Sequence, residues 1–537
     1  KDPGHEPIRR LTHTEYGRTV RDLFGVEVDV AGKFPIDLSG TSGFDNSANT
    51  LFLQGPLLER YIHVADHVVE QALPESAESA GQKRSRELVF VSRPTGETSS
   101  EEAARAILER FLLRAYRRPA TRSEVDAFMD QFRRARQSGE EFESAVKRTL
   151  KVVLISPNFL LRIEAGRETD EAYRVGEWEL ASRLSYFLWA SMPDDELFEL
   201  ARRKRLRDPA VLRRQVRRML AEPRAKTLGS VFAAQWLGFE HVGTRVRLDP
   251  IDNPWCTDTL MHAMKEESAL FFLSLVQENS PISRLVDADY TYLNEELARH
   301  YEIDGVRGAR LRRVALDNPN RGGIFGQASL LAVTSFPHRT SPVVRGKWIL
   351  ADVLGTPPPP PPPDAGEFSE EVREKRRLTL REKLEIHREN PRCNACHQEI
   401  DPLGFSLENF GRFGRWRTSI RGRPIDAKGR LPDGTEFEGP VGLKKIIVER
   451  RMPDLVRQIS RKMLSYALGR QLEYYDEPAV RKIVRTLEEN DYRFGTLIDE
   501  VVTSYPFQFK KNRKKNRKKD RKKDREKSGS PGKVKRF

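Results

Sequence analysis

Cysteine is scarce in this sequence, and long hydrophobic runs are missing. The 537 residues include three cysteines, Cys256, Cys393 and Cys396, so a zinc ribbon, which needs a second cysteine pair or two further ligands, has no evident ligand set. No apolar run approaches the roughly 18 residues of a membrane-spanning helix; the longest, 269–276, fits the buried face of a helix. With 38% hydrophobic residues the chain can still bury several cores, and its length predicts about two to four domains.

A charge bias is also missing from most of the chain. The net charge is +15, but residues 510–537 hold 16 Lys and Arg against three acids and so carry +13 of it, which leaves +2 for all the rest. A segment so charged and so poor in apolar side chains cannot bury enough surface to offset its chain entropy. Residues 510–537 are therefore predicted to be a disordered polybasic tail that binds an anionic membrane surface or an acidic polysaccharide.

One short stretch carries the clearest chemical signal: Cys393-Asn394-Ala395-Cys396-His397. C-x-x-C-H is the attachment signature of a c-type haem. Two thiols three residues apart can add to the two vinyl groups of one porphyrin, and the imidazole that follows then lies beneath the iron. The motif predicts haem c as cofactor, with Cys393 and Cys396 as covalent attachments and His397 as the proximal iron ligand.

Two other interpretations of the cysteine pair stay open. Cys393 and Cys396 could bind zinc if further ligands lie nearby in the fold. A C-x-x-C pair can also form a disulfide or a redox centre, although the charged helical stretch before the motif differs from the strand expected there.

The remaining iron and porphyrin contacts have several candidates. His387, ten residues before His397, and Met463, which shares an apolar helical stripe with core residues, are equally good candidates for the distal ligand. Arg412, Arg415 and Trp416 are candidates for contacts with the haem propionates, since a guanidinium matches a carboxylate in a bidentate manner. The alternative for these arginines is a solvated cluster.

Apolar residues recur at helical spacing over most of the chain, and the predicted fold class is mainly α. We expect a multi-domain helical protein, almost wholly helical over residues 1–355, with a small C-terminal cytochrome-c-like module that contains a short β-hairpin within 418–440. Pro357 to Pro363 predict a stiff polyproline II spacer. The chain is expected to turn away from the haem motif at Ile400 to Phe405.

The expected segments are an N-terminal helical domain (1–75), a linker (76–100), a helical domain (101–165), a long helical domain (173–305), a Gly/Pro-rich segment with the haem module (306–417), the hairpin with a C-terminal helical domain (418–509) and the tail (510–537).

Two functions without haem were weighed. Ser335 or Ser341 with His338 forms a local grouping typical of a hydrolase, but the G-x-S-x-G elbow and an ordered acid partner are missing. A helical scaffold that presents its surfaces to polysaccharide or to partner proteins is the second alternative.

Several short sequence motifs, in the order in which they occur here, resemble those of one family, the large planctomycete-type cytochrome-c-like proteins built from consecutive domains of unknown function. The phrases that carry the resemblance are Gly43-Phe44-Asp45-Asn46, Tyr116-Arg117-Arg118-Pro119, Ala181 to Trp189, Arg339 to Trp348, the proline run, Cys393 to Trp416, and Tyr466-Ala467-Leu468-Gly469-Arg470. The resemblance extends from Ile8 to about Lys510. Because the activity of that family is undefined, the resemblance implies an architecture with a C-terminal C-x-x-C-H module rather than a reaction.

The expected function follows from the haem. We expect an exported c-type haem protein that transfers electrons to a redox partner protein or serves an envelope system for oxidation or polymer degradation; a haem-dependent oxidoreductase is not distinguished from an electron carrier. Haem c is normally attached outside the cytoplasm, so the periplasm or cell envelope is the expected location, with an export signal upstream of Lys1. That location favours membrane and polysaccharide over nucleic acid as the partner of the tail.

Overall fold

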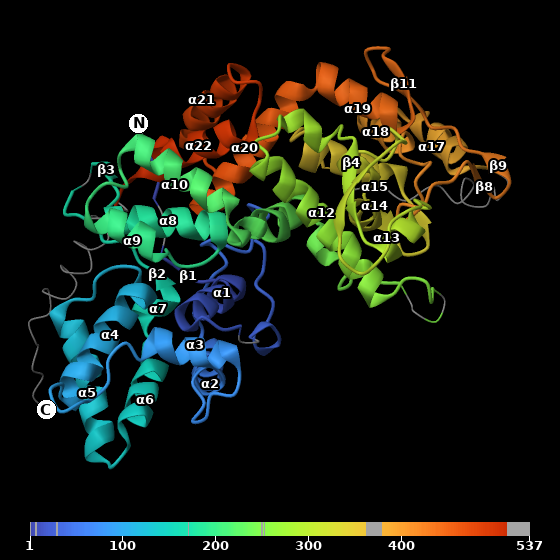
Figure 1. Ribbon diagram of the computed structural model, residues 1–537. Coiled ribbons are helices and arrows are strands. Elements are labelled where there is room, and N and C mark those ends of the chain that lie inside the picture. Colours follow the sequence, from blue (N-terminus) through green and yellow to red (C-terminus); the bar gives the residue numbers. More distant parts are fainter. Residues whose placement is uncertain are drawn as a thin grey trace, which may run out of the picture.

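The computed structural model describes residues 2–5, 8–27, 30–169, 171–248, 251, 253–360 and 378–512. Figure 1 shows an arched molecule. The N-terminal helices form one end, the segment around α17 (Leu380–Arg388) and α18 (Pro391–Phe405) forms the other, and helices from the middle and the C-terminal part of the chain lie between them. Residues 361–377, which include Pro361 to Pro363 of the predicted spacer, lie outside the described part.

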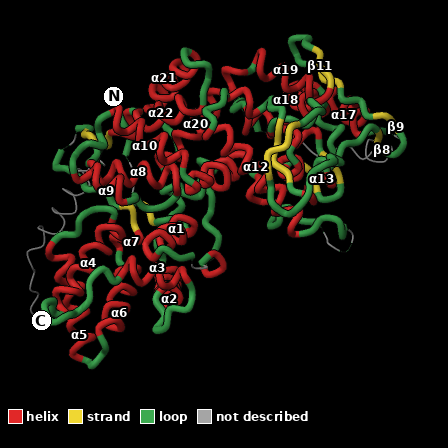
Figure 2. Tube along the Cα trace, viewed as in Figure 1, coloured by secondary structure: helices red, strands yellow, loops and turns green. Residues whose placement is uncertain are grey.

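Helices make up most of the described chain, as Figure 2 shows. In the N-terminal part they are α1 (His13–Phe24), α2 (Gly55–Ala72), α3 (Ala80–Val89), α4 (Ser100–Tyr116), α5 (Arg122–Gln137), α6 (Phe142–Leu154) and α7 (Pro157–Leu160). In the middle they are α8 (Glu177–Trp189), α9 (Asp195–Arg202), α10 (Pro209–Ala221), α11 (Ala234–Leu237), α12 (Asp258–Gln277), α13 (Glu295–His300), α14 (Ala328–Val333) and α15 (Pro342–Trp348). After α17 and α18 come α19 (Gly439–Arg450), α20 (Met452–Leu468), α21 (Glu477–Glu488), α22 (Phe494–Thr503) and α23 (Tyr505–Gln508).

The strands are short and pair only two by two within the described residues. The antiparallel pairs are β1 (Arg9–Arg10) with β2 (Leu161–Arg162), β3 (Tyr173–Arg174) with β12 (Phe509–Lys510), β4 (Tyr290–Leu293) with β5 (Arg312–Ala315), β6 (Ser335–Phe336) with β7 (Arg339–Thr340), β8 (Ser419–Ile420) with β9 (Arg423–Pro424), and β10 (Lys428–Arg430) with β11 (Glu436–Glu438). The mainly α fold class is confirmed.

Two local predictions need correction. Residues 76–100, expected as a linker, contain α3, which begins with a capping box formed by Ser79 and Gln82; the polar composition hid a helix whose start is encoded in two side chains. The segment 418–440, expected as one hairpin, forms two, because the turn residues before Lys428 separate β8–β9 from β10–β11.

The buried side chains of the described residues form two large cores and a smaller one. One large core is built from α1, α2 and α4–α7 and reaches Tyr186 of α8. The other joins α8, α12, α18 and α20–α22, so residues far apart in the sequence share one interior. The smaller core lies around α12 and α13 and includes Phe413. Segments expected as separate domains are therefore held together by shared apolar burial.

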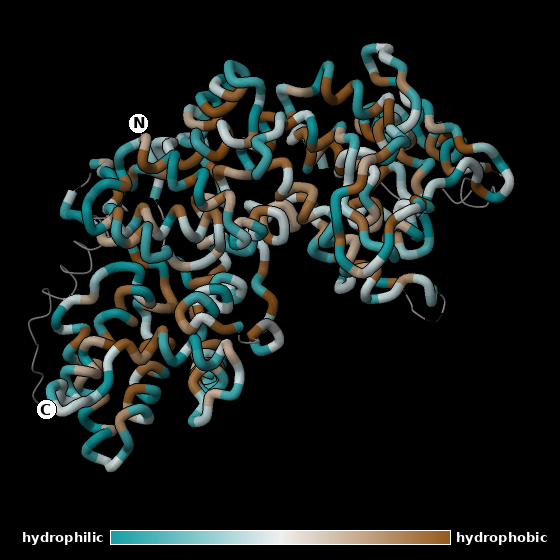
Figure 3. The backbone as a smooth tube through the Cα atoms, in the orientation of Figure 1, coloured by the Kyte–Doolittle hydropathy of each residue, from teal (hydrophilic) through white to brown (hydrophobic). Residues whose placement is uncertain are grey.

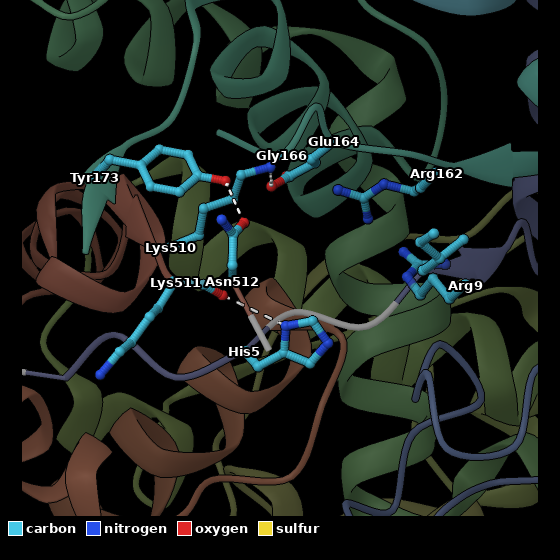
Figure 4. Close-up of a pocket in the computed structure, with 10 residues that line it drawn as sticks. His5, Arg9, Arg162, Glu164, Gly166, Tyr173, Lys510, Lys511 and Asn512 are labelled. Atoms are coloured by element: carbon cyan, nitrogen blue, oxygen red, sulfur yellow. Dashed lines mark hydrogen bonds and ion pairs between the residues drawn. The ribbon is translucent and has the colours of Figure 1, made fainter. Parts of the chain in front are cut away.

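The two ends of the described chain lie against the same loop. A pocket of about 160 Å³ is lined there by His5, Glu164, Tyr173 and Lys510, as Figure 4 shows. Lys510 pairs with Glu164 at 3.2 Å, and the Tyr173 hydroxyl donates to Asn512 at 3.1 Å. Lys510 is buried and belongs to β12, so the predicted tail boundary at 510 is too early; the chain is described to 512, and residues 513–537 lie outside the described part.

Among the described residues no helix combines the length and the apolarity that crossing a bilayer requires. Figure 3 shows hydrophobic and hydrophilic residues alternating along the helices. This alternation is typical of helices that bury one face against a neighbour.

Candidate functional site

The C-x-x-C-H motif lies in the second helix of a tight helical hairpin, α17 followed by α18. α17 begins at a capping box on Thr379. α18 begins after Asn390, whose side chain accepts a hydrogen bond from the Arg392 N–H at 3.0 Å, with Pro391 at the first helical position, where no N–H is needed. Only 389–390 connect the helices, so the end of α17 is held beside the start of α18.

Both cysteines fall within the first two turns of α18. Residues three apart share one face of a helix, and Cys393 and Cys396 are three apart. Both thiols are half-buried, and neither is joined in a disulfide. Cys396 packs against the large core that joins α8, α12, α18 and α20–α22. The two sulfurs are thus on one side of the helix.

His397 is held by a buried carboxylate one turn further along α18. Its Nδ1 lies 2.9 Å from Oδ1 of Asp401, whose side chain is 0% exposed. A carboxylate can only accept, so Nδ1 carries the proton and donates it to Asp401. Nε2 then keeps its lone pair, and it has no hydrogen-bond partner among the described residues. A carboxylate on the far nitrogen is the arrangement that orients imidazole ligands of metals.

Asp401 is the functional residue that sequence reasoning missed. The expected turn at Ile400 to Phe405 is wrong, because α18 continues to Phe405 with Pro402 inside it. In that helix Asp401 is four residues after His397 and therefore on the same face. The spacing was the available signal, and the assumption of a turn concealed it.

His387 at the end of α17 lies beside the motif histidine. The His387 and His397 ring centroids are 4.9 Å apart and the rings are nearly perpendicular. Burial, and then the neighbouring His397, lower the pKa of His387 below its ordinary value, which favours the neutral imidazole that binds metals. Met463, the other candidate distal ligand, is fully buried in the large core on α20. The structure thus brings together His387 and His397.

The helix that carries the motif is packed closely against α15. A Cβ on Gly404 of α18 would lie 1.8 Å from the Pro342 carbonyl oxygen, and one on Gly346 of α15 would lie 1.9 Å from the Ile400 carbonyl oxygen. Real Cβ atoms do not approach an oxygen so closely, and only glycine leaves this space. Through this contact the segment around Gly346 lies directly against the helix that carries the motif.

Arg345 of α15 holds the segment that leaves α18. Its guanidinium is 0% exposed and donates to the carbonyl oxygens of Leu407, Phe410 and Gly411 at 2.7–3.0 Å and to Glu408 at 3.2 Å. Burial lowers the pKa of Arg345 to about 10, so it remains charged at neutral pH. One buried cation therefore satisfies a whole turn of backbone that would otherwise lack partners.

The predicted propionate contacts lie beyond the other end of α18. Arg412 donates to the Pro337 carbonyl oxygen, and Arg415 lies 5.0 Å over the Trp255 ring. Trp416 packs edge-on against Phe410. Cys396 and Phe405 are nine residues apart, about 13 Å along a helix. The structure does not gather these side chains around His397, and their contact with propionates stays a prediction.

The hydrolase grouping is not assembled. The Ser335 hydroxyl donates to the Leu331 carbonyl oxygen at 2.8 Å, and the Ser341 hydroxyl caps α15 through the Val344 N–H at 3.3 Å. The exposed His338 stacks on Phe336. Both hydroxyls are thus engaged in local structure.

The zinc alternative lacks a ligand set in the described part of the chain. No three His, Cys, Asp or Glu side chains are placed there to hold a metal ion.

Five family models match the chain one after another. Each is described as a protein of unknown function: DUF1587 at 9–74, DUF1595 at 103–164, DUF1592 at 175–303, DUF1588 at 321–420 and DUF1585 at 433–507. The chain is a planctomycete-type multi-domain protein. The motif of this planctomycete-type protein lies within the DUF1588 match, whose model is named PSCyt3, a name that hints at a cytochrome-type domain. No curated protein and no solved structure matches the chain.

Proposed function

We propose that this planctomycete-type protein is an exported c-type haem protein that transfers electrons. The observation that carries the proposal is the C-x-x-C-H motif at the start of a helix whose histidine is already oriented by a buried carboxylate. Two half-buried thiols on one helix face and an imidazole with an unengaged Nε2 fit the covalent and axial requirements of haem c.

Each side chain has a defined task in this proposal. Cys393 and Cys396 hold the porphyrin through thioether bonds, and His397 presents Nε2 to the iron. Asp401 keeps the proton on Nδ1 of His397. His387, adjacent in the fold, is proposed over Met463 as the second axial ligand, because Met463 is enclosed in the core. When bound, the haem would supply a one-electron redox couple, and its ligation by both His397 and His387 would favour electron transfer over activation of a small oxidant.

The location and partners follow from the cofactor. Attachment of haem c takes place outside the cytoplasm, which supports a periplasmic or envelope location and a redox partner protein. The basic residues after Asn512 support contact with an anionic surface of the envelope, a membrane or an acidic polysaccharide, rather than with nucleic acid.

The direct test uses the full chain produced together with a cytochrome c maturation system. The mass of the denatured protein should increase by one haem, and the reduced protein should show the α-band of a thioether-linked haem. An unmodified mass, or stoichiometric zinc in place of iron, would exclude the proposal.

Asp401→Asn is expected to raise the reduction potential while leaving the haem attached. Asparagine retains the size of the side chain but removes the negative charge that stabilises the oxidised iron through His397. The expected rise is on the order of 60 mV, the equivalent of a tenfold change for a one-electron couple. Spectroelectrochemistry measures it, with Glu399→Gln, a change of an exposed side chain on the same helix, as the control. Equal potentials in the two variants would assign Asp401 to structure alone.

Deleting residues 513–537 is expected to abolish salt-sensitive binding to anionic liposomes. The deletion removes 14 Lys and Arg and three acids, hence +11, but keeps β12 and its contacts with Glu164 and Tyr173. Each basic residue near an acidic membrane contributes about 1 kcal/mol at low salt, so binding should fall by at least about a hundredfold. Liposome sedimentation measures binding, and an uncharged Gly/Ser tail of equal length is the control. Persistent binding, or a changed haem spectrum, contradicts the proposed arm.

A further inference from the structure

A large cleft lies beside the α17–α18 hairpin, and its lining includes neither the thiols nor His397. The two helices run antiparallel, so His387 meets His397 at one end, and Arg381 lies 3.9 Å over the Phe405 ring at the other. The cleft has a volume of about 1330 Å³, more than the roughly 300–1,000 Å³ of most small-molecule sites. Its walls come from segments 338–342, 378–385, 405–417 and 420–426, together with Trp255. These residues define the cationic cleft.

The lining of the cationic cleft is strongly positive. It contains seven arginines and one lysine against three glutamates and one aspartate, a net charge of +4. The whole chain outside residues 510–537 carries only +2. The positive charge of the folded body is therefore concentrated here, where walls of low dielectric constant strengthen its field.

The four carboxylates of the cleft are already engaged by arginines of the cleft. The pairs are Arg381 with Asp426 at 3.2 Å and with Glu385 at 3.8 Å, Arg417 with Glu408 at 3.1 Å, and Arg423 with Glu382 at 3.4 Å. Four further arginines of the lining have no carboxylate partner in the part of the chain that the structure describes: Arg339, Arg412, Arg415 and Arg421. No carboxylate of the described residues therefore neutralises these four guanidinium groups.

Three of these four arginines are held in place by neutral groups. Arg412 donates to the Pro337 carbonyl oxygen, and Arg339 donates to the Thr340 carbonyl oxygen at 3.1 Å. Arg415 lies over Trp255 and approaches Nδ1 of His300 at 3.4 Å. These contacts use one edge or face of each guanidinium without neutralising it. The remaining N–H groups are oriented before a ligand arrives, which lowers the entropic cost of binding.

His300 adds orientation but no charge to the cleft. Its Nε2 donates to the Phe413 carbonyl oxygen at 2.6 Å, so Nδ1 can accept from Arg415. Burial lowers the pKa of His300 to about 4, with further lowering by Arg415. The imidazole is neutral at physiological pH, and the positive field of the cleft comes from the arginines.

The aromatic lining offers no open ring for stacking. The Trp255 ring stacks on His300 at 5.4 Å and is covered by Arg415, and the Phe405 ring is covered by Arg381. Phe413 is buried. Proteins that hold single-stranded nucleic acid depend on bases stacking on exposed aromatic rings. The charges also lie within a cleft rather than on a projecting face, which suits a chain better than a membrane surface.

We propose that the cationic cleft binds an acidic polysaccharide, a chain with carboxylate or sulfate groups on successive sugars. Guanidinium groups pair with both anions in a bidentate manner. Arg339, Arg412 and Arg421 come from β7, the segment after α18 and the β8–β9 turn, and a chain with anionic groups on successive sugars can contact all three. Neither the two thiols nor His397 lines this cleft.

The test is the affinity of the full chain for fluorescent oligogalacturonate and for sulfated dextran, measured by anisotropy. The variant Arg339→Gln/Arg412→Gln/Arg421→Gln should weaken binding by about tenfold or more, because three charge-assisted contacts are lost. The control variant Arg122→Gln/Arg202→Gln/Arg203→Gln removes the same charge from exposed positions on α5 and at the C-terminal end of α9, and it should change affinity less than about twofold. Each variant is also measured with residues 513–537 deleted, so that anion binding by the polybasic tail does not mask the contribution of the cleft.

Three results would overturn the proposal. Equal losses in the two triple variants would mean that charge alone is recognised. Galacturonic acid monomer binding as well as its oligomers would indicate a site for a small anion, and tighter binding of an oligodeoxythymidine of equal charge would indicate nucleic acid. Circular dichroism confirms that the variants fold, and Arg339→Lys/Arg412→Lys/Arg421→Lys, which keeps the charge but loses the planar fork, should lie between the wild type and the glutamine variant.

Discussion

Cys393→Ala/Cys396→Ala is expected to eliminate covalent haem completely. The two thiols are the proposed attachment points, they lie on one face of α18, and Cys256, the third cysteine, is buried in another part of the fold. Without a thioether bond, haem is held only by axial ligation and packing, and it leaves on denaturation. Mass spectrometry of the denatured, matured protein should change from one added haem to none, and the haem stain on a denaturing gel should disappear.

Cys256→Ala is the matched control. It removes a buried thiol on the smaller core and should leave the added haem mass unchanged. Each single variant, Cys393→Ala or Cys396→Ala, should retain one thioether and shift the reduced α-band to longer wavelength. A double variant that still carries covalent haem, or a Cys256→Ala variant that loses it, would contradict the assignment of the motif.

Arg345→Met is expected to cause the largest loss of stability of any single substitution considered. Methionine fills a similar volume but leaves the carbonyl oxygens of Leu407, Phe410 and Gly411 without their donor. Breaking a buried charged network of this kind costs roughly 3–5 kcal/mol. Urea denaturation monitored by circular dichroism should show a lower midpoint for the transition that includes α15 and α18.

Arg122→Met provides the comparison for Arg345→Met. The Arg122 side chain is 95% exposed, and its substitution should change the free energy of unfolding by less than about 0.5 kcal/mol. Arg345→Lys should be intermediate, because an ammonium group keeps the charge but cannot reach several carbonyl oxygens at once. If Arg345→Met unfolds at the same urea concentration as Arg122→Met, the buried arginine does not hold the segment after α18.

Local signals in the sequence predicted most of the helices. The capping box at Thr12 and Glu15 marks the start of α1, and two side chains that satisfy backbone donors can be recognised without tertiary information. The same rule applies to Ser79 and Gln82, which mark the start of α3, although the polar composition of residues 76–100 predicts a linker there. Amphipathic spacing and helix caps involve residues within one or two turns, so they can be recognised in the amino-acid sequence alone.

Part of the candidate site could be predicted from the sequence alone, and the rest required the tertiary structure. Cys393, Cys396 and His397 form a motif of five consecutive residues, so sequence alone determined them and the chemistry that they predict. Sequence alone also determined the concentration of positive charge after Asn512 and the order of the five matching segments.

Only the tertiary structure decided which residues surround the motif. The proximity of His387 to His397 depends on the two-residue turn between α17 and α18, and the role of Asp401 depends on a helix that continues through Pro402. The close packing of α15 against α18 joins segments about 50 residues apart, and the cationic cleft joins segments about 170 residues apart. Such contacts follow from how apolar faces pack and which polar groups must be satisfied when they do, and those conditions involve the whole chain at once.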